Sequence, residues 1–381
     1  MNSFTRIDVH HHAFPTALQT AKMAGSGALG WKMTAEGRHW SLEISLGAME
    51  TLKIQKAILS LPPGYPPDQN GVRVANEELK GMCDRYPTRF GFWAVLGDLR
   101  NTKGAHALSL RDSCLHPTSY TGLIPFATRF LLEVIEEIRY AFDVLKANGV
   151  SITSSYGKAE NSGEPRLPGA RVLADLAHSF PTVYLGDRVF DPIWEELNTR
   201  RAAVFLHGAQ TRPERPDPHD FLGIPIVEVP HETFKAAASL VVSGRKRKYP
   251  NINFVLAHLG GSTPFLAPRV AVLSNYMGSG LTPEDILDDF KTFYYDTALS
   301  SHESTLTAMQ SFVSPDRLVF GTDFPGTRSR GFSKLVVCSS LRAAVSKDMA
   351  AWYTKQTDQF HRDPDAPVWR NNILEILANV T

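Results

Sequence analysis

The sequence predicts an α/β fold: one closed, TIM-like (β/α)8 barrel that forms a single domain over residues 1–381. Eight short apolar runs recur along the chain, which is the number of strands that such a barrel needs. Helical patterns lie between several of these runs, and strands that alternate with helices indicate parallel βαβ units. No glycine-rich phosphate loop follows the first run, which disfavours the competing arrangement, a doubly wound open sheet.

The eight runs are nearly continuously apolar, as is typical of strands that are buried on both faces. Many of them end in a polar residue, a glycine or a proline. In chain order, the predicted strands are Arg6–His12, Lys56–Leu61, Phe90–Leu96, Gly149–Ser155, Ala202–His207, Ile252–His258, Phe293–Ala298 and Arg317–Thr322. Between the first two strands, Thr16–Gln55 is expected to form a small excursion from the barrel.

The clearest helical pattern covers Phe130–Ala147, where apolar residues recur near positions i, i+3, i+4 and i+7. Asn148 and Gly149 follow it and are typical of a helix end. Each predicted helix lies between two consecutive strands, as the βαβ arrangement requires. The three others are Asp191–Arg201, Glu232–Ser243 and Pro283–Asp289.

Two connections are longer than a compact barrel needs: Gly97–Arg129 after the third strand and Lys158–Arg188 after the fourth. Within them we assign βα-loop insertions to about residues 101–130 and 159–183. Lids, neutral insertions and non-coding sequence retained by a gene model are all consistent with their composition. Because they carry few apolar anchors, we expect them to be loosely packed and dispensable.

Composition excludes several classes of partner. Hydrophobic residues make up 43% and charged residues 21%, as in a soluble globular protein. The net charge of +1 offers no electrostatic surface for nucleic acid or an anionic membrane. The one short basic run, Arg245–Lys248, is interpreted as a solvated helix end. No apolar run reaches about 18 residues, and the strand predicted from Arg6 leaves no room for a secretory leader.

Three cysteines, Cys83, Cys114 and Cys338, are far apart and match no metal-binding or redox spacing. Three thiols cannot all pair within one chain. We interpret them as buried thiols in a reducing compartment, which predicts a cytoplasmic location.

Three consecutive histidines, His10, His11 and His12, end the first predicted strand. Alternate side chains of a strand share a face, so His10 and His12 point the same way and His11 points the other way. Two imidazoles on one face at a strand end are a ready pair of metal ligands. A purification-tag fragment and a solvated histidine cluster are the alternatives, and the strand that leads into these residues disfavours the tag.

Three further polar residues end predicted strands: His207 the fifth, His258 the sixth and Asp323 the eighth. A single histidine at such a position is more often a hydrogen-bonded core residue than a ligand. In a barrel, however, the C-terminal ends of all strands meet at the face that carries the active site. Together with the histidine pair of the first strand, these residues predict a metal site at that face.

Other candidates carry weaker signals. Asp296 lies near the end of the seventh strand, where a cap or a loop-fixing hydrogen bond is favoured over a direct role. For the aromatic residues Phe14, Tyr65, Trp93 and Phe324, packing in the core is favoured over the wall of a substrate pocket.

Several segments resemble the amidohydrolase superfamily and, within it, the aminocarboxymuconate-semialdehyde decarboxylase family of non-oxidative decarboxylases. They are IDVHHHAFP, LAHLGGSTPF, FYYDTAL and LVFGTDFP. SLPPG, AFDVLKANGV and YLGDRVFDPIWEELNTRRAAVFLHG are most similar to the fungal 6-methylsalicylate decarboxylase branch. The resemblance spans about residues 5–326 and is interrupted at the two insertions.

The resemblance implies one divalent metal ion, zinc or manganese, with four ligands: His10, His12, His207 and Asp323. It also implies catalytic roles for His258, as an acid/base residue beside the ion, and for Asp323, as the carrier of a proton to the substrate. The fourth strand ends at Ser154 and Ser155 without a lysine that could bridge a second ion, which agrees with one ion per chain.

The activity that the resemblance implies is metal-dependent, non-oxidative decarboxylation of a small aromatic carboxylic acid. The expected substrate is 6-methylsalicylate, converted to 3-methylphenol and CO2 in fungal secondary metabolism. A homodimer is expected, with no nucleic-acid or membrane partner. Two alternatives stay open: a lactonase-type hydrolase of the same superfamily, and an inactive barrel whose mouth is blocked by its insertions.

Overall fold

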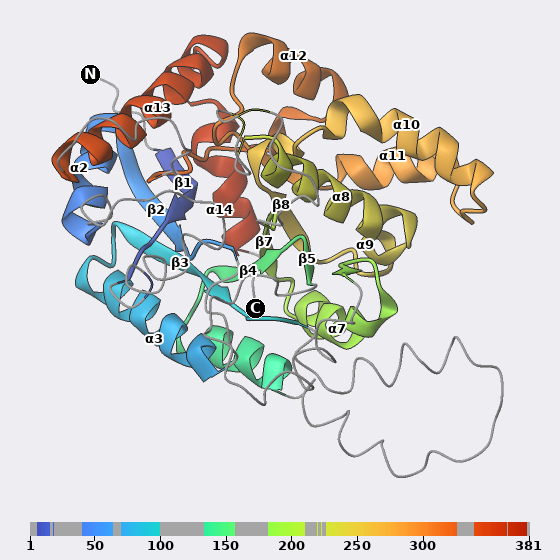
Figure 1. The fold of residues 1–381 in the computed structure, drawn as a ribbon, viewed down its shortest axis with the longest axis horizontal. Helices are drawn as coiled ribbons and strands as arrows, with labels where there is room; N and C mark the ends of the chain where they lie inside the picture. The colour runs from blue at the N-terminus through green and yellow to red at the C-terminus, as the bar shows by residue number, and fades with distance from the viewer. Residues whose placement is uncertain are drawn as a thin grey trace.

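The computed structural model describes residues 6–15, 18, 40–63, 70–99, 133–156, 182–209, 219, 222, 226–325, 339–363 and 365–378. In this part of the chain, eight parallel strands form one sheet, and helices surround it, as Figure 1 shows. In sheet order, the strands are β1 (Arg6–His12), β2 (Ile54–Ser60), β3 (Phe90–Val95), β4 (Gly149–Thr153), β7 (Ala203–His207), β8 (Asn253–Leu256), β9 (Tyr294–Asp296) and β10 (Leu318–Val319).

The sheet closes between its first strand and the chain at the end of its last. Val9 N–H donates to Phe320 O (3.0 Å), and His12 N–H donates to Phe324 O (2.7 Å). This closure confirms the predicted (β/α)8 barrel. It also excludes the doubly wound open sheet, because such a sheet would leave the edges of its outer strands without backbone partners.

Helices follow most of the strands and cover the outside of the barrel (Figure 1). All four predicted helices are present, with bounds that differ by a few residues. Described from residue 133, the first of them is α-helical at 133–139 and continues as a π-helical turn, Tyr140–Val144. The other three predicted helices are α7 (Asp191–Thr199), α8 (Glu228–Val242) and α11 (Pro283–Lys291). The described residues also form helices that were not predicted: α2 (Leu42–Leu52), α3 (Asn70–Arg85), α9 (Arg245–Lys248), α10 (Thr263–Tyr276), α12 (Glu303–Phe312), α13 (Ser339–Phe360) and α14 (Asn371–Ala378).

Side chains fill the interior of the barrel. They form one buried cluster with contributions from most of the strands, including Ile7, Val9, Ile58, Trp93, Phe205, Val255 and Val319. α14 closes the N-terminal end of the barrel, because Ile373 and Ile376 belong to the same cluster. A larger apolar cluster packs the outer faces of the strands against the helices. The open end that remains for a functional site is therefore the C-terminal one.

The eight predicted strands are all present, and most of them are shorter than predicted. The fourth differs most: β4 ends at Thr153, and the next residues form β5 (Ser155–Tyr156), which pairs antiparallel with β6 (Val183–Tyr184). The predicted insertions lie outside the described residues at 101–130 and 159–181. Val183, the last residue assigned to the second insertion, belongs to β6.

The basic run Arg245–Lys248 forms α9, and its interpretation as a solvated helix end is wrong for one residue. Lys246 is only 4% exposed, and burial lowers its pKa to about 8. Its Nζ lies 5.4 Å from the centre of the Phe293 ring. The neighbouring Arg247 forms an ion pair with Asp285 of α11 (2.7 Å), so the run anchors α9 to the helix beside it.

Cys83 is buried, as predicted, and burial raises the pKa of its thiol to about 12. Cys114 and Cys338 lie outside the described residues. No helix in the described part of the chain combines the length and the hydrophobicity that a membrane crossing requires.

Candidate metal centre

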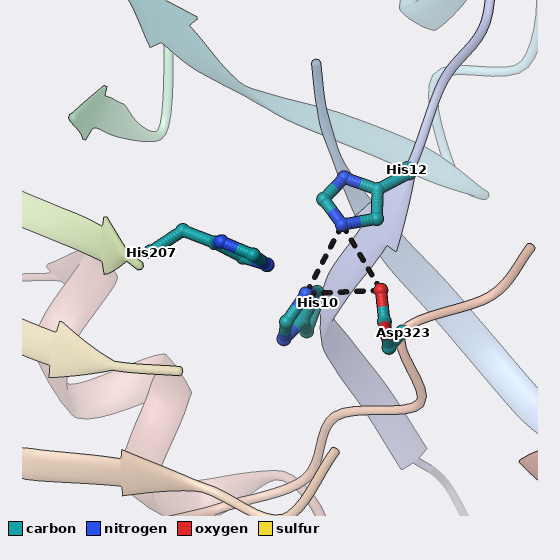
Figure 2. Close-up of side chains that lie close together, drawn as sticks. All are labelled: His10, His12, His207 and Asp323. Atoms are coloured by element: carbon teal, nitrogen blue, oxygen red, sulfur yellow. Dashed lines mark hydrogen bonds and ion pairs between the residues drawn. The ribbon is translucent and has the colours of Figure 1, made fainter. Parts of the chain in front are cut away.

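The four residues predicted as metal ligands meet at the C-terminal end of the barrel. His10 and His12 come from β1, His207 ends β7, and Asp323 lies in the loop after β10. Figure 2 shows the His207 ring facing the other three from across the barrel. One possible ligand atom of each residue lies within 4.8 Å of all the others, and all four residues are buried.

The distances among these atoms suit a shared cation. His10 Nε2 lies 3.2 Å from His12 Nε2 and 3.3 Å from Asp323 Oδ1, and His12 Nε2 lies 3.0 Å from the same oxygen. Two ligands of a tetrahedral ion at about 2.05 Å are separated by about 3.3 Å. Adjacent ligands of an octahedral ion at about 2.1 Å are separated by about 3.0 Å. The group could therefore hold a divalent metal ion of either geometry.

A β-bulge in β1 aims His10 into the barrel. Between Asp8 and His11, β1 has one residue more than the paired stretch of β2, where their partners are Ala57 and Leu59. Val9 can therefore belong to the interior cluster while the next side chain, His10, also faces inward. Bulges re-aim side chains in this way next to active sites. The prediction that His10 and His12 point to one face of β1 and His11 to the other is confirmed.

Asp296 orients the His10 ring. His10 Nδ1 lies 2.8 Å from Asp296 Oδ2, and a carboxylate can only accept, so Nδ1 donates and Nε2 is the nitrogen left to face a cation. Asp296 Oδ1 accepts from two backbone amides, His258 N–H (3.0 Å) and Ala298 N–H (2.9 Å). The loop-fixing hydrogen bonds predicted for Asp296 are confirmed, and its contact with His10 is of the kind by which a carboxylate orients a metal-binding histidine.

The other two histidines are oriented in the same sense. His207 Nδ1 donates to the carbonyl of Gly208 (2.9 Å), which leaves Nε2 as the ligand atom. His12 Nδ1 contacts Ser60 Oγ (3.0 Å) at the end of β2. Each imidazole therefore engages the protein through Nδ1, and Nε2 is the ligand atom. Ser60 was not singled out from the sequence, although a hydroxyl at the end of the strand beside β1 was an available signal.

His258 lies beside these four residues, and with His10 and Asp296 it forms a second group whose possible ligand atoms lie within 4.8 Å of one another. Its ring centre is 4.9 Å from that of His10 and 5.2 Å from that of His207. Its Nδ1 donates to the carbonyl of Ala298 (3.0 Å), so Nε2 is the atom available for other partners. Burial, together with the nearby His10, lowers the pKa of His258. The side chain is therefore a neutral imidazole.

The charge on His10 and the charges on the nearby carboxylates stabilise each other in the site. Burial opposes a charge on His10, but the carboxylates of Asp296 and Asp323 raise its pKa to about 10. Burial also opposes a charge on Asp323, but His10 and His12 hold its pKa well below the usual range. Burial lowers the pKa of His207 well below the ordinary value, with a further contribution from His10. With a pKa of about 10, His10 also carries a proton on Nε2, and a bound cation would have to replace that proton. The donor set would then be three imidazoles and an ionised carboxylate, which suits a divalent cation.

The aromatic candidates separate into two groups. Trp93 and Phe324 are buried, and Trp93 Nε1 donates to Val9 O inside the barrel (2.8 Å), as expected of core residues. Phe14 is half-buried, and its ring centre lies 6.4 Å from that of His12 at the edge of the site. Tyr65 lies outside the described residues.

Known proteins resemble this chain in sequence and in fold. The 6-methylsalicylic acid decarboxylase of Penicillium expansum is 32% identical over 331 residues, which cover 84% of this chain and 85% of the relative. A 2,6-dihydroxybenzoate decarboxylase solved with 2,6-dihydroxybenzoate has the same fold, with a TM-score of 0.64 at 19% identity, over 99% of this chain and 100% of the other. A dihydroxybenzoic acid decarboxylase from Polaromonas sp. JS666 was solved with manganese and an inhibitor. Its TM-score to this chain is 0.60 at 18% identity, and the match covers 94% of this chain and 98% of the other.

A family model described as amidohydrolase matches residues 7–337, which include all four residues of the candidate metal centre. The match covers well over half of the chain, and it agrees with the resemblance found in the sequence. This chain is therefore a member of the amidohydrolase family.

Proposed function

We propose that this protein is a carboxy-lyase that removes CO2 from a small aromatic acid without net oxidation. The expected substrate is 6-methylsalicylate, and the products are 3-methylphenol and CO2. The observation that carries the proposal is the buried group of His10, His12, His207 and Asp323 in a chain that is 32% identical to a 6-methylsalicylic acid decarboxylase. The other decarboxylase structures of the same fold support the reaction class.

We assign these four residues as the ligands of one divalent ion. Zinc is our first choice because three imidazoles and one carboxylate form a nitrogen-rich set. Manganese is the alternative, because the similar structure from Polaromonas holds it. When bound, the ion supplies Lewis acidity for the substrate carboxylate and an ortho oxygen.

In the proposed reaction, Asp323 carries a proton to the ring carbon that bears the carboxylate. The bond between that carbon and the carboxylate then breaks, its electron pair restores the aromatic ring, and CO2 leaves. Asp323 is the most exposed of the four residues, at 8%, which supports this role. Because Asp323 is ionised at rest, it must first take this proton from solvent, and the proton that ends on the product is a solvent proton.

His258 is proposed to bind the substrate carboxylate or to help deliver the proton. Its Nδ1–H is held by the Ala298 carbonyl, so only Nε2 can serve this purpose. A neutral imidazole at this place can accept a proton and return it within one turnover.

The experiment combines metal analysis with an assay for CO2. Purified protein should hold about one divalent ion per chain, and His10→Ala or His207→Ala should lose most of it. The loaded enzyme should release CO2 from 6-methylsalicylate, and Asp323→Asn should lower kcat by several orders of magnitude while the protein stays folded. Hydrolysis of a lactone without CO2 release would favour the hydrolase. A metal-loaded protein that turns over neither substrate would favour the inactive barrel.

We also propose that the protein is a homodimer that associates through α10. Phe265, Tyr276 and Met277, in or directly after this helix, are 83%, 84% and 87% exposed, and such apolar surface is typical of an interface. Sedimentation of the wild type and of a Phe265→Ser, Tyr276→Ser variant tests this, and a monomeric wild type would refute it. The cytoplasmic location stays a prediction that cell fractionation can test.

A further inference from the structure

Behind the metal ligands, on the other face of β1, lies a buried set of hydrogen bonds that the proposed reaction does not use. It consists of Asp8 and His11 of β1, Ser45 of α2 and Thr322 in the loop after β10, and we call these four residues the clamp. Asp8, His11 and Ser45 are each 0% exposed.

Asp8 joins the two chain segments that carry three of the four metal ligands. Its Oδ1 accepts from His10 N–H (3.1 Å) and from Thr322 N–H (3.0 Å). Its Oδ2 accepts from the Thr322 hydroxyl (2.6 Å) and from His11 Nδ1 (3.0 Å). Four donors fill the acceptor positions of an ionised carboxylate. The side chain is therefore held in one position, between His10 and the residue that precedes Asp323.

Through Thr322, Asp8 also holds the backbone on both sides of Asp323. Its Oγ1 donates to Asp8 and accepts from Phe324 N–H (3.1 Å), while its own N–H bonds Asp8. Asp323 itself has φ 58°, a left-handed conformation that non-glycine residues rarely adopt. The residues on either side of this unusual conformation are thus tied, directly or through one hydroxyl, to the same carboxylate.

His11 links Asp8 to the helix that covers this side of the barrel. Because Nδ1 donates to the Asp8 carboxylate, Nε2 must accept, and its partner is the Ser45 hydroxyl (2.9 Å). Ser45 Oγ in turn accepts from Trp40 Nε1–H (3.0 Å). The hydrogen bonds therefore run in one direction, from Trp40 through Ser45 and His11 to Asp8. At each step a donor meets an acceptor.

This connectivity is that of a serine–histidine–aspartate triad, but the chemistry is different. A nucleophilic serine needs a reachable oxygen, and Ser45 is fully buried with its lone pair engaged by Trp40. We infer that the clamp positions Asp323 relative to His10 and His12, and so sets the geometry in which these residues hold the metal ion. Asp8, His11, Ser45 and Thr322 are positioning residues that act through the ligands. This inference rests on the proposed metal centre and not on the identity of the substrate.

The test replaces Thr322 by valine, which keeps the shape and removes both hydrogen bonds of the hydroxyl. Loss of a partner that orients a metal ligand typically weakens metal binding by about 10–100-fold. We expect Thr322→Val to raise the Kd for zinc by that factor in chelator competition. We also expect it to alter the visible absorption of the cobalt-substituted protein, which reports the ligand geometry and not the stability of the fold.

Thr357→Val is the matched control. Thr357 is also buried, and its hydroxyl donates to Ser301 Oγ (2.8 Å) at α13, away from the clamp. The control should lose stability but keep the wild-type Kd and cobalt spectrum. Wild-type metal binding and spectrum in Thr322→Val would overturn the inference.

A second variant covers the case in which Thr322→Val does not fold. Ser45→Ala leaves the lone pair of His11 Nε2 without its donor at the far end of the clamp. We expect a smaller increase in the zinc Kd and the same kind of spectral change, and a wild-type result here would overturn the inference. A wild-type protein that binds neither zinc nor cobalt would refute the proposed metal centre itself. This outcome differs from a failure of the clamp, in which the wild type binds metal and the variants bind it equally well.

Discussion

Removal of residues 159–182 should leave a well-formed β-hairpin. In the antiparallel pair of β5 and β6, Tyr156 is opposite Val183 and Ser155 is opposite Tyr184. The deletion joins Lys158 to Val183, so only Gly157 and Lys158 connect the two paired residues. Two residues are the length of a tight hairpin turn, and glycine at the first position suits the type II′ turn.

The size of the effect follows from the length of chain that the pair closes. In the full protein, 26 residues, 157–182, separate Tyr156 from Val183, whereas the deletion leaves two. The entropic cost of closing a flexible loop scales as (3/2)RT ln n, so shortening it by this ratio should add about 2 kcal/mol to the free energy of unfolding.

Denaturant titration of the wild type and the deletion variant measures this difference, and the CO2 assay measures activity. A third protein, in which Gly and Ser replace all 24 residues, 159–182, is the control. It keeps the loop length and removes any specific contacts, so we expect it to match the wild type in stability and in activity.

Two results would refute this reasoning. A deletion variant that fails to fold, or is less stable than the wild type, would mean that the segment stabilises the barrel through contacts of its own. A variant that folds but releases no CO2 would make the segment a working part of the enzyme. The Gly/Ser protein should then show the same loss of activity.

Three further predictions concern single residues. Asp296→Asn should raise the metal Kd by about 10–100-fold, because the amide would donate to His10 Nδ1 and leave Nε2 protonated. Chelator competition measures this Kd, and a wild-type affinity would contradict the prediction. His258→Ala should keep about one ion per chain but reduce turnover, and loss of the metal in elemental analysis would make His258 a ligand. Lys246→Met should raise the free energy of unfolding at pH 7 by up to about 3 kcal/mol, since the folded-state pKa of Lys246, about 8, lies below its ordinary 10.5. This gain should fade between about pH 8 and 10.5, where wild-type folding no longer requires a buried charge, and a gain that does not change with pH would show that charge burial is not its cause.

Local patterns in the sequence were sufficient for the barrel and for the polar residues that meet at its C-terminal face. The resemblance to a known family, and not the pattern, singled out four of them as metal ligands. Apolar runs report strands because a strand buried on both faces must be apolar along its whole length. Polar residues at the ends of these runs, such as His207 and Asp323, are exceptions that mark the C-terminal face. Alternation along a strand was enough to separate His10 and His12 from His11.

Tertiary structure decided how the ligands are held. Asp296 meets His10 across 286 positions of the chain, and Thr322 meets Asp8 across 314. Neither contact leaves a periodic signal, because each depends on the closure of the barrel. The same holds for Lys246, which lies in a basic run that predicts solvent exposure, yet α9 turns its side chain inward.

The sequence by itself therefore determined the fold class and the polar side chains that gather at the C-terminal face of the barrel, since hydrophobic periodicity and strand-end polarity are local properties. The bulge that re-aims β1, the orientations of the His10 and His207 rings and the hydrogen bonds of the clamp were decided only by the folded chain. A hydrogen bond between distant segments depends on where the backbone places both partners, and only the closed barrel defines those places.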